Sequence, residues 1–388
     1  MIKLRIGADQ NSVTIELPAA DEYLRSVLLH ELHAASTYIN RPTFVEEVDF
    51  PTQLNFIAGK QVNLDELNYL AKRLDSFTDD EMSQYFAAVQ REGFRNMKSL
   101  INLTFNLDRY TLITDVSSPL AIGKKYTLNT EGAIPTDHSR DAEFDSLGRD
   151  IIAGRKGDLT EYGLLIVSDK PMEQYYDGKT FPLYDYYGSL LFVGIKYDER
   201  EEGVSIAEDP GSIITAINRL GAEKPSDCKA YILEYSPKLE PMMDRLREVL
   251  EKEGLMALSR VARKMYEGNI DAAELNAVAD FAKVHSSANL ITLADHLNKF
   301  EYMKDVLDEE DVGRYFVDEY DNGHTYQVSI EMEDYVDFRT FGTDMMEKYH
   351  GKFIEGGAVC FSNEYDMDIL DELEPENENQ SMGGMSFD

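Results

Sequence analysis

The hydrophobic and polar positions of the first 60 residues predict a small α+β module. Apolar and polar residues alternate in Leu4–Gly7 and Ser12–Leu17, which predicts two short strands joined by a polar turn. The segment Asp21–Leu32 predicts a helix, and Phe44–Phe50 predicts a further strand.

Leucines at helical spacing follow directly. The apolar stripe consists of Leu64, Leu67, Leu70, Ala71 and Leu74. Asn63 with Glu66, and Thr78 with Glu81, have the spacing of capping boxes, in which each residue's side chain bonds the other's backbone N–H at a helix start. We therefore expect three or four short helices between about 62 and 107.

The pattern then loosens into short strands and glycine-rich turns. Tyr110–Thr114 predicts a strand, residues 130–143 read as a polar linker, and the interval from Gly157 to Gly163 predicts a turn that leads into the strand Leu164–Val167.

The second half of the chain repeats this order about 190 residues later. Strands are predicted in SLLFVGIKYD, GVSIAE and KAYILEYS, a helix in PGSIITAINRLG, and further helices at about 241–265, 271–284 and 286–299. Leu100, Leu107 and Tyr110 match Leu290, Leu297 and Phe300, and a second set of matches is displaced by 194 residues: Gly148, Gly157, Glu161 and Gly163 recur as Gly342, Gly351, Glu355 and Gly357. Such a long period indicates a duplicated unit, not a solenoid.

We therefore expect an elongated α+β chain built as a tandem repeat of two units, each with an α+β module, a short-helix bundle and a second α+β module. The predicted boundaries are 1–60, 61–113, 114–187, 188–240, 241–304 and 305–363, followed by a flexible acidic tail at 364–388.

Charge is the unusual quantity in the composition. The chain has 73 acidic and 38 basic residues, a formal net charge of -35. Residues 1–190 hold 29 acidic and 19 basic residues, and the remainder holds 44 and 19, so the second half is the more acidic. Affinity for phosphates comes from Lys and Arg, so we expect no direct nucleic-acid ligand. A protein that binds nucleic acid is the better candidate for a partner.

Signatures of common chemistry are missing from the sequence. The histidines of HELH, His30 and His33, are three residues apart, whereas a zincin helix needs four, so no metal site is expected. No phosphate-binding loop, dinucleotide motif or nucleophile elbow occurs, and we expect neither a cofactor nor enzymatic activity. Cys228 and Cys360 lie in apolar contexts without metal spacing, which predicts buried, reduced thiols.

No apolar run reaches 18 residues, and the N-terminal segment lacks the apolar centre of a signal peptide. We expect a cytoplasmic protein that does not enter a membrane.

Clusters of carboxylates are the main candidate for a partner-binding surface. The candidate residues are Asp305, Asp308, Glu309, Glu310, Asp311, Asp318, Glu319, Asp321, Glu331, Glu333, Asp334 and Asp337, with Asp141, Glu143, Asp145 and Asp150 in the first half. A solvated surface is the simple interpretation. However, 35 unbalanced charges equal the bare charge of about 60 Å of duplex DNA. Self-repulsion on that scale costs stability, which favours a functional use of the charge, the imitation of DNA phosphates.

Several phrases resemble the ArdA antirestriction family. They are LNYLAKRLDSF (Leu67–Phe77), SLINLTFNLDRYTLI and SLGRDIIAGRKGDLTEYG in the first half, and NLITLADHLNKFEYM, EEDVGRYFVDEYD and VDFRTFGTDMMEKYHGKFIEGGAV in the second. The resemblance implies a protein of phages, plasmids or conjugative elements that imitates bent B-form DNA. It also implies three small modules per unit, homodimers, and occupation of the DNA-binding groove of type I restriction–modification enzymes in the host cytoplasm.

The chain departs from that family in length, because members have one unit and this chain has two. The fusion allows an intrachain pseudo-dimer or a homodimer with a longer rod. Three alternatives stay open: a mimic directed at a CRISPR effector or another defence complex, an acidic scaffold or chaperone for basic proteins, and a hydrolase with unrecognised carboxylates.

Overall fold

The computed structural model describes residues 1–8, 11–33, 42–154, 157–318, 333 and 335–375. It shows a mixed α+β protein, as expected, and the described residues form four small sheets. The chain divides into two compact units. The first contains Met1–Tyr186, Lys196–Gly203 and Gly211–Glu223, and the second contains Tyr187–Ile195, Val204–Pro210 and Lys224–Asp388. In the part of the chain that the structure describes, no helix combines the length and the apolar character needed to cross a membrane.

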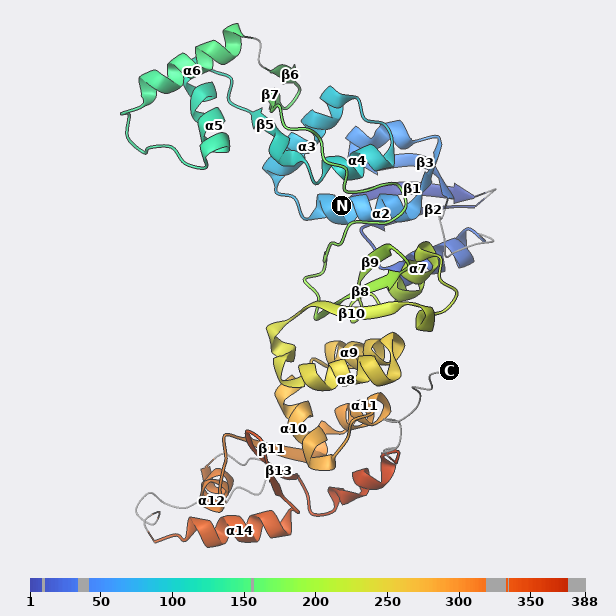
Figure 1. The fold of residues 1–388 in the computed structure, drawn as a ribbon, viewed down its shortest axis with the longest axis vertical. Helices are drawn as coiled ribbons and strands as arrows, with labels where there is room; N and C mark the ends of the chain where they lie inside the picture. Colours follow the sequence, from blue (N-terminus) through green and yellow to red (C-terminus); the bar gives the residue numbers. More distant parts are fainter. Residues whose placement is uncertain (9–10, 34–41, 155–156, 319–332, 334, 376–388) are drawn as a thin grey trace, which may run out of the picture. The chain divides into compact units, whose positions relative to one another are not determined.

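The first module of unit 1 has a four-stranded antiparallel sheet in the order β2-β1-β3-β4 (Figure 1). Its elements are β1 (Ile2–Ala8), β2 (Asn11–Leu17), α1 (Asp21–Ser26), a π-helical turn (Val27–Glu31), β3 (Pro42–Phe50), a 3-10 helix (Thr52–Ile57) and β4 (Lys60–Asn63). The three predicted strands are confirmed. The predicted helix over Asp21–Leu32 is divided between α1 and the π-helical turn.

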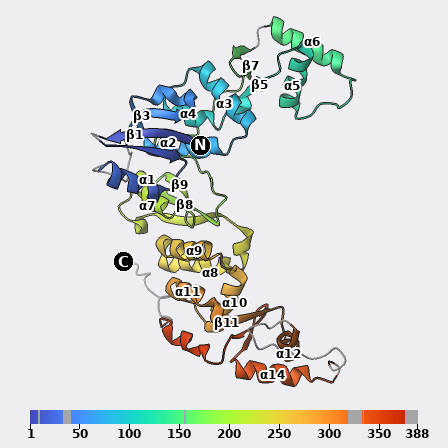
Figure 2. The same cartoon turned by 180° about the vertical axis from the view of Figure 1, so that it is seen from behind.

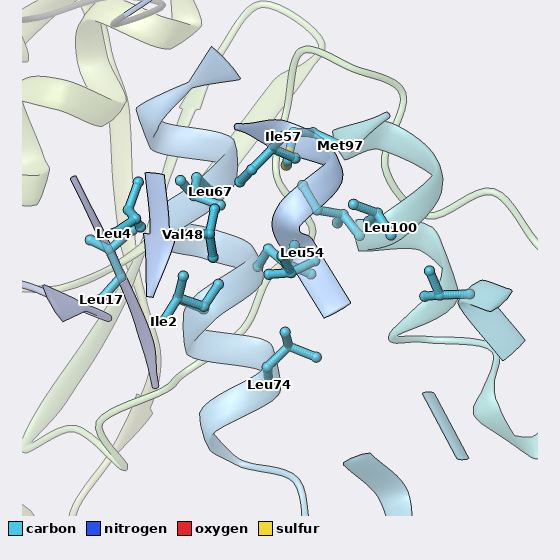
Figure 3. Close-up of a cluster of buried hydrophobic side chains, with 14 of the residues drawn as sticks. Ile2, Leu4, Leu17, Val48, Leu54, Ile57, Leu67, Leu74, Met97 and Leu100 are labelled. Carbon is cyan, nitrogen blue, oxygen red and sulfur yellow. The ribbon is translucent and has the colours of Figure 1, made fainter. Parts of the chain in front are cut away.

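Three helices share one hydrophobic core with this sheet: α2 (Leu64–Asp75), α3 (Asp79–Glu92) and α4 (Met97–Leu103). Figure 3 shows side chains of the strands, including Leu4 and Val48, gathered with Leu67 of α2 and Leu100 of α4, and all four are buried. The predicted apolar stripe of α2 therefore faces the core of unit 1, as its helical spacing requires.

The two predicted capping boxes differ in the structure. Thr78 and Glu81 form both hydrogen bonds of the box at the start of α3. Asn63 caps α2 by accepting from the Asp65 N–H, but the Glu66 carboxylate accepts instead from the Tyr176 hydroxyl at 2.9 Å. The expected Asn63–Glu66 box is therefore only half formed.

The next module contains two helices that the sequence reading missed. Its elements are β5 (Tyr110–Ile113), α5 (Pro119–Glu131), α6 (Asp141–Ala153), β6 (Asp158–Thr160) and β7 (Gly163–Val167), with strand order β5-β7-β6. The expected polar linker at 130–143 includes the last residues of α5 and the first of α6. Each helix buries only three of its 13 residues, so neither has the wide apolar stripe that marks a core helix in a sequence.

Glycines allow α5 and α6 to lie side by side (Figures 1 and 2). A Cβ on Gly123 would stand 1.9 Å from the carbonyl oxygen of Phe144, and one on Gly148 would stand 1.8 Å from that of Pro119. No larger residue fits either position without moving the backbone. The pair α5/α6 is called the first hairpin below.

Residues 168–186 form an extended segment along the helices of unit 1. The Asn102 side chain exchanges two hydrogen bonds with the backbone of Tyr176, and Asn106 does the same with Glu173. Phe181 stacks on Tyr69 of α2 with 4.6 Å between ring centroids. The segment thus covers one face of α2.

A third α+β module follows, with a sheet in the order β10-β8-β9. Its elements are β8 (Leu191–Tyr197), β9 (Arg200–Ser205), α7 (Gly211–Leu220) and β10 (Lys229–Tyr235). Four helices of unit 2 follow: α8 (Met243–Glu253), α9 (Leu255–Gly268), α10 (Ala272–Ala282) and α11 (Ser287–Asp295). The single helix expected at 241–265 is wrong, because Gly254 with φ of 86° separates α8 from α9.

The last module has the element order and strand order of the β5–β7 module. It contains β11 (Phe300–Lys304), α12 (Glu309–Asp318), α14 (Phe338–Lys348), β12 (Lys352–Ile354) and β13 (Gly357–Phe361), in the order β11-β13-β12. Cβ atoms on Gly313 and Gly342 would stand 2.0 and 1.8 Å from the carbonyl oxygens of Phe338 and Glu309. The pair α12/α14, the second hairpin, therefore uses the same glycine contact as the first.

The flexible tail expected from residue 364 does not begin there. Asp366–Glu372 forms a 3-10 helix whose Ile369 is fully buried. Asn289 exchanges two hydrogen bonds with the backbone of Glu374, as Asn102 does with Tyr176 in unit 1. Residues 376–388 of the expected tail lie outside the described residues.

Candidate functional site

The carboxylates predicted in unit 1 lie on α6 of the first hairpin. Asp141 pairs with Lys124 of α5 at 2.5 Å, Glu143 with Arg140 at 2.6 Å, and Asp145 with Arg149 at 2.8 Å. Hydrogen bonds from Lys124 and then His138 lower the pKa of Asp141, and the hydrogen bond from Arg140 lowers that of Glu143. Three of the four carboxylates are thus paired with cations within the chain.

The fourth residue, Asp150, is exposed near the end of α6. Among the described residues it has no hydrogen-bonded or ion-paired side-chain partner, so its charge is available to an external cation.

The carboxylates at the start of α12 build the N-terminus of that helix. The Asp311 N–H donates to Asp308 Oδ1 at 3.0 Å, and Asp311 Oδ2 accepts from the Leu307 N–H at 3.3 Å. Negative charge near the N-terminus of a helix also interacts favourably with the helix dipole. Asp308 and Asp311 therefore have a structural role that the charge density alone did not indicate.

Cations of the second hairpin pair with the neighbouring acids. Glu310 pairs with Arg314 at 3.0 Å, one turn further along α12. Arg339 of α14 lies 3.8 Å from the carboxylates of both Asp308 and Glu309. These pairs are exposed and individually weak, so they leave the carboxylates accessible to other cations.

Asp337 caps α14. Its carboxylate accepts from the Thr340 N–H at 3.0 Å and from the Thr340 hydroxyl at 2.8 Å. The hydrogen bond from the backbone N–H lowers the pKa of Asp337, and the hydrogen bond from the hydroxyl lowers it further.

The remaining predicted carboxylates have no such role in the described part of the chain. Asp305 is exposed after β11, at φ of 62°. Glu333 is half-buried and Asp318 ends α12, while Glu319, Asp321, Glu331 and Asp334 lie outside the described residues.

Further exposed carboxylates were not singled out from the sequence. Asp344 and Glu347 are one turn apart on α14, and Asp79 and Asp80 lie in the first turn of α3. Within the described ranges none of the four has a cation partner. Their spacing becomes informative only when the helices are known, because isolated acids do not form a run in the sequence.

A groove of about 680 Å³ lies in unit 1, with polar and apolar side chains in its lining. Lys170 on its wall pairs with Asp108 at 3.0 Å, and the Gln84 side chain donates to the carbonyl oxygens of Leu107 and Tyr110. These contacts connect neighbouring segments of the chain. None of them pairs a nucleophilic side chain with a general base. In the described part of the chain, no group of three or more His, Cys, Asp or Glu side chains is arranged to hold a metal ion.

A buried cluster of charged side chains joins three elements of unit 1. Arg219 of α7 contacts Glu202 of β9 at 2.7 Å and Asp65 of α2 at 3.5 Å, with side-chain exposures of 14%, 3% and 2%. Burial raises the pKa of Glu202, although the charge of Arg219 and its hydrogen bonds oppose the shift. The enclosed position of this cluster suits a structural joint and leaves little room for a ligand.

The cysteines are both free thiols. Cys360 is buried in β13, whereas Cys228 is only half-buried, so the expectation of two buried thiols is right for Cys360 alone.

The sequence matches no known protein-family model and no curated protein.

Proposed function

We propose that this protein is a DNA mimic that occupies the DNA-binding groove of a type I restriction–modification enzyme and so prevents that enzyme from binding DNA. The observation that carries the proposal is the excess of carboxylates over cations: 73 acidic residues stand against 38 basic ones. Many described cations are already paired within the chain, as Lys124, Arg140 and Arg314 are.

The two hairpins suit such a role because their carboxylates lie on helices that are packed closely against each other. Side chains three or four residues apart on a helix lie about 5–6 Å from each other at Cβ. Asp344 and Glu347 of α14, and Glu143 and Asp150 of α6, stand on helices fixed by the glycine contacts of each hairpin. Fixed charges need little ordering when a partner binds, which favours affinity.

A groove that binds DNA is lined by Lys and Arg, and its field would attract this chain over long distances. Charge complementarity of this kind mainly raises the association rate and makes binding depend on salt. The resemblance of several segments to ArdA proteins supports type I enzymes as the target class.

The test is competition for a type I methyltransferase core preloaded with labelled duplex DNA. We expect stoichiometric release of the DNA by this protein. A hairpin variant removes six charges without removing a helix cap: Glu143→Gln, Asp150→Asn, Glu309→Gln, Glu310→Gln, Asp344→Asn and Glu347→Gln. We expect this variant to need at least about ten times the native concentration to release the DNA. A close charge pair across an interface contributes on the order of 1.5 kcal/mol or more to binding.

A matched control removes six exposed charges away from the hairpins: Glu16→Gln, Glu46→Gln, Glu47→Gln, Asp198→Asn, Glu199→Gln and Glu223→Gln. Equal losses in both variants would indicate a non-specific effect of net charge, as expected of an acidic scaffold for basic proteins. No release of DNA by the native chain at low salt would exclude type I enzymes, and a CRISPR effector core would then be the next target to assay.

A further inference from the structure

A pocket of about 310 Å³ lies in unit 2, near the start of β8. Its lining comes mainly from three places: the residues that precede β8, the 3-10 helix Pro237–Met242 after β10, and the connection from α9 to α10. All of its lining residues belong to the described part of the chain. The volume is within the range of small-molecule sites in proteins.

Two residues of opposite charge line this pocket. Glu208 follows β9, and Lys238 lies in the 3-10 helix after β10. No ion pair joins them, and neither has an ionic partner elsewhere in the described part of the chain. Each charge is therefore available to an opposite charge on a ligand, and hydrogen bonds between ionised groups are stronger than those between neutral ones.

The Glu208 carboxylate is held in place, but only one of its oxygens is satisfied. Oε1 accepts from the Leu190 N–H at 2.6 Å, and the Leu190 carbonyl oxygen accepts from the Ser236 N–H at 3.0 Å. Oε2 is buried and has no hydrogen-bond partner among the described residues. A buried acceptor without a donor is costly, so an ammonium group placed beside Glu208 is favoured.

Polar and apolar side chains complete the lining. The chain turns at Asn269, which ends α9 with φ of 45°. In the described ranges, neither its side-chain amide nor the Tyr266 hydroxyl has a hydrogen-bond partner. The buried Leu239 and Met265 and the half-buried Ile270 provide apolar surface. The pocket can therefore hold an apolar group beside its two charges.

Unit 1 has a pocket among the corresponding elements, but its lining differs. This pocket of about 340 Å³ lies among Met1 before β1, the residues after β3, and the connection from α2 to α3. Its lining includes Phe50 and Phe86, its acidic residue is Asp79, and no Lys or Arg lines it. The Met1 amino group is paired with Asp75 at 2.9 Å. Of these two pockets, only the one in unit 2 is lined by a carboxylate together with a lysine.

We propose that the unit 2 pocket binds a free amino acid with an apolar side chain. The ammonium group of the ligand faces Glu208, its carboxylate faces Lys238, and its side chain packs against Leu239 and Ile270. A simple anion is repelled by the net charge of -35, and a simple amine leaves Lys238 unmatched. A zwitterion matches both charges and has no net charge of its own. The inference does not depend on DNA mimicry.

The test is NMR of the full chain with labelled isoleucine δ1-methyl groups, in which the Ile270 signal is assigned from an Ile270→Val variant. The protein is titrated with L-leucine, L-methionine and L-phenylalanine. We expect a saturable shift of the Ile270 methyl signal, with one ligand per chain. No saturable shift with any of the three amino acids would overturn the inference.

Two analogues of leucine test whether both charges of the ligand are recognised. 4-Methylpentanoate lacks the ammonium group and should bind at least about tenfold more weakly than leucine, because it leaves Glu208 without a donor. Isoamylamine lacks the carboxylate and should bind at least about threefold more weakly, a smaller loss because Lys238 is exposed. Either analogue binding as tightly as leucine would contradict the recognition of a zwitterion.

Substitutions in the pocket provide a second measurement. Glu208→Gln keeps an oxygen that can accept from the Leu190 N–H but removes the charge, and it should raise the dissociation constant for leucine at least about tenfold. Lys238→Gln should remove the preference for leucine over isoamylamine. Glu234→Gln and Lys229→Gln, which change exposed residues of β10 outside the lining, are the matched controls and should leave the constant unchanged.

Lys238 is exposed, so its variant is expected to fold even if Glu208→Gln is unstable. A Lys238→Gln chain that still prefers leucine over isoamylamine would overturn the proposal. So would a folded Glu208→Gln chain that binds leucine as tightly as the native chain.

Discussion

At the scale of single residues, Arg219 has the largest expected effect on stability. It is the cation that Glu202 and Asp65 share inside unit 1. Removing one partner of a buried ion pair costs about 3–5 kcal/mol, because the remaining charges are left buried without compensation.

We therefore predict that Arg219→Ala lowers the free energy of unfolding of unit 1 by about 3–5 kcal/mol. Urea titration with hydrogen exchange read out in α2 and β9 measures the change. Arg263→Ala removes an exposed arginine, paired with Glu267, and should cost less than about 1 kcal/mol. Equal effects of the two substitutions would show that the buried cluster is not a joint.

The cysteines should differ in reactivity. Cys360 is fully buried and its pKa is raised by burial, so its thiolate is scarce and inaccessible. Burial also raises the pKa of Cys228, but this residue is only half-buried. With iodoacetamide at pH 8, mass spectrometry should show slow labelling of Cys228 and labelling of Cys360 only after denaturation. Labelling of both at one rate in the native protein would contradict the described burial.

The charge density of the sequence singled out many acidic residues but did not predict the structural role of several of them. Asp308, Asp311 and Asp337 were chosen for charge density, yet they cap helices that the sequence reading had not placed. Conversely, Asp344 and Glu347 were overlooked because their relation is visible only once α14 is known. A local count of charges cannot separate a cap from a free carboxylate.

At the scale of elements, the hairpins depend on glycine. We predict that Gly148→Ala or Gly342→Ala opens its own hairpin, because a Cβ would stand 1.8 Å from the backbone oxygen of Pro119 or Glu309. Overpacking costs about 1–3 kcal/mol, which exceeds the gain of about 1 kcal/mol from the better helix propensity of Ala. Hydrogen exchange in α5 and α6, or α12 and α14, reports the opening.

Ser146→Ala is the control for that prediction. Ser146 is exposed on α6, two residues from Gly148, so the substitution adds no contact inside the hairpin. Protection of α5 and α6 should stay unchanged. If Gly148→Ala also left the protection of α5 and α6 unchanged, the described close approach of the two helices would be contradicted.

Substitutions of Asp337 can separate the effect of the helix cap from the effect of the charge. Asp337→Ala should destabilise the second hairpin by about 1 kcal/mol, whereas Asp337→Asn should have a much smaller effect, because Asn is also a good N-cap. Because the folded pKa of Asp337 is lowered, its ionised cap contributes stability above the ordinary Asp pKa, and this contribution is lost as pH falls through the lower folded value. Hydrogen exchange of α14 between pH 6 and 3 measures both effects.

The sequence predicted elements well where they bury an apolar stripe and poorly where they do not. The leucines of α2 recur at helical spacing and face the core, so this helix was found. α5 and α6 were missed because glycines interrupt them and few of their residues are buried. The matched glycines Gly148 and Gly342 were found as a repeat, but their reason, the contact between helices, lies in the fold.

At the scale of the whole molecule, salt should weaken the proposed binding to a restriction enzyme. Displacement of DNA from a methyltransferase core depends on opposite charges, so the affinity of this protein for the core should fall at least about tenfold between 50 and 200 mM NaCl.

Titrations at both salt concentrations, with fluorescence anisotropy of the labelled DNA as the readout, measure this change. Displacement that does not change with salt would contradict mimicry.

The sequence by itself determined the charge, and it predicted the main strands and the apolar stripe of α2, because these follow from composition and from local periodicity. The 190-residue tandem repeat stays a prediction from the sequence. Only the tertiary structure decided which carboxylates cap helices, which are paired and which are free, since their partners come from other turns or other helices. It also brought together Asp65, Glu202 and Arg219, which are distant in the sequence. Such contacts depend on how the elements pack, and local propensity contains no information about them.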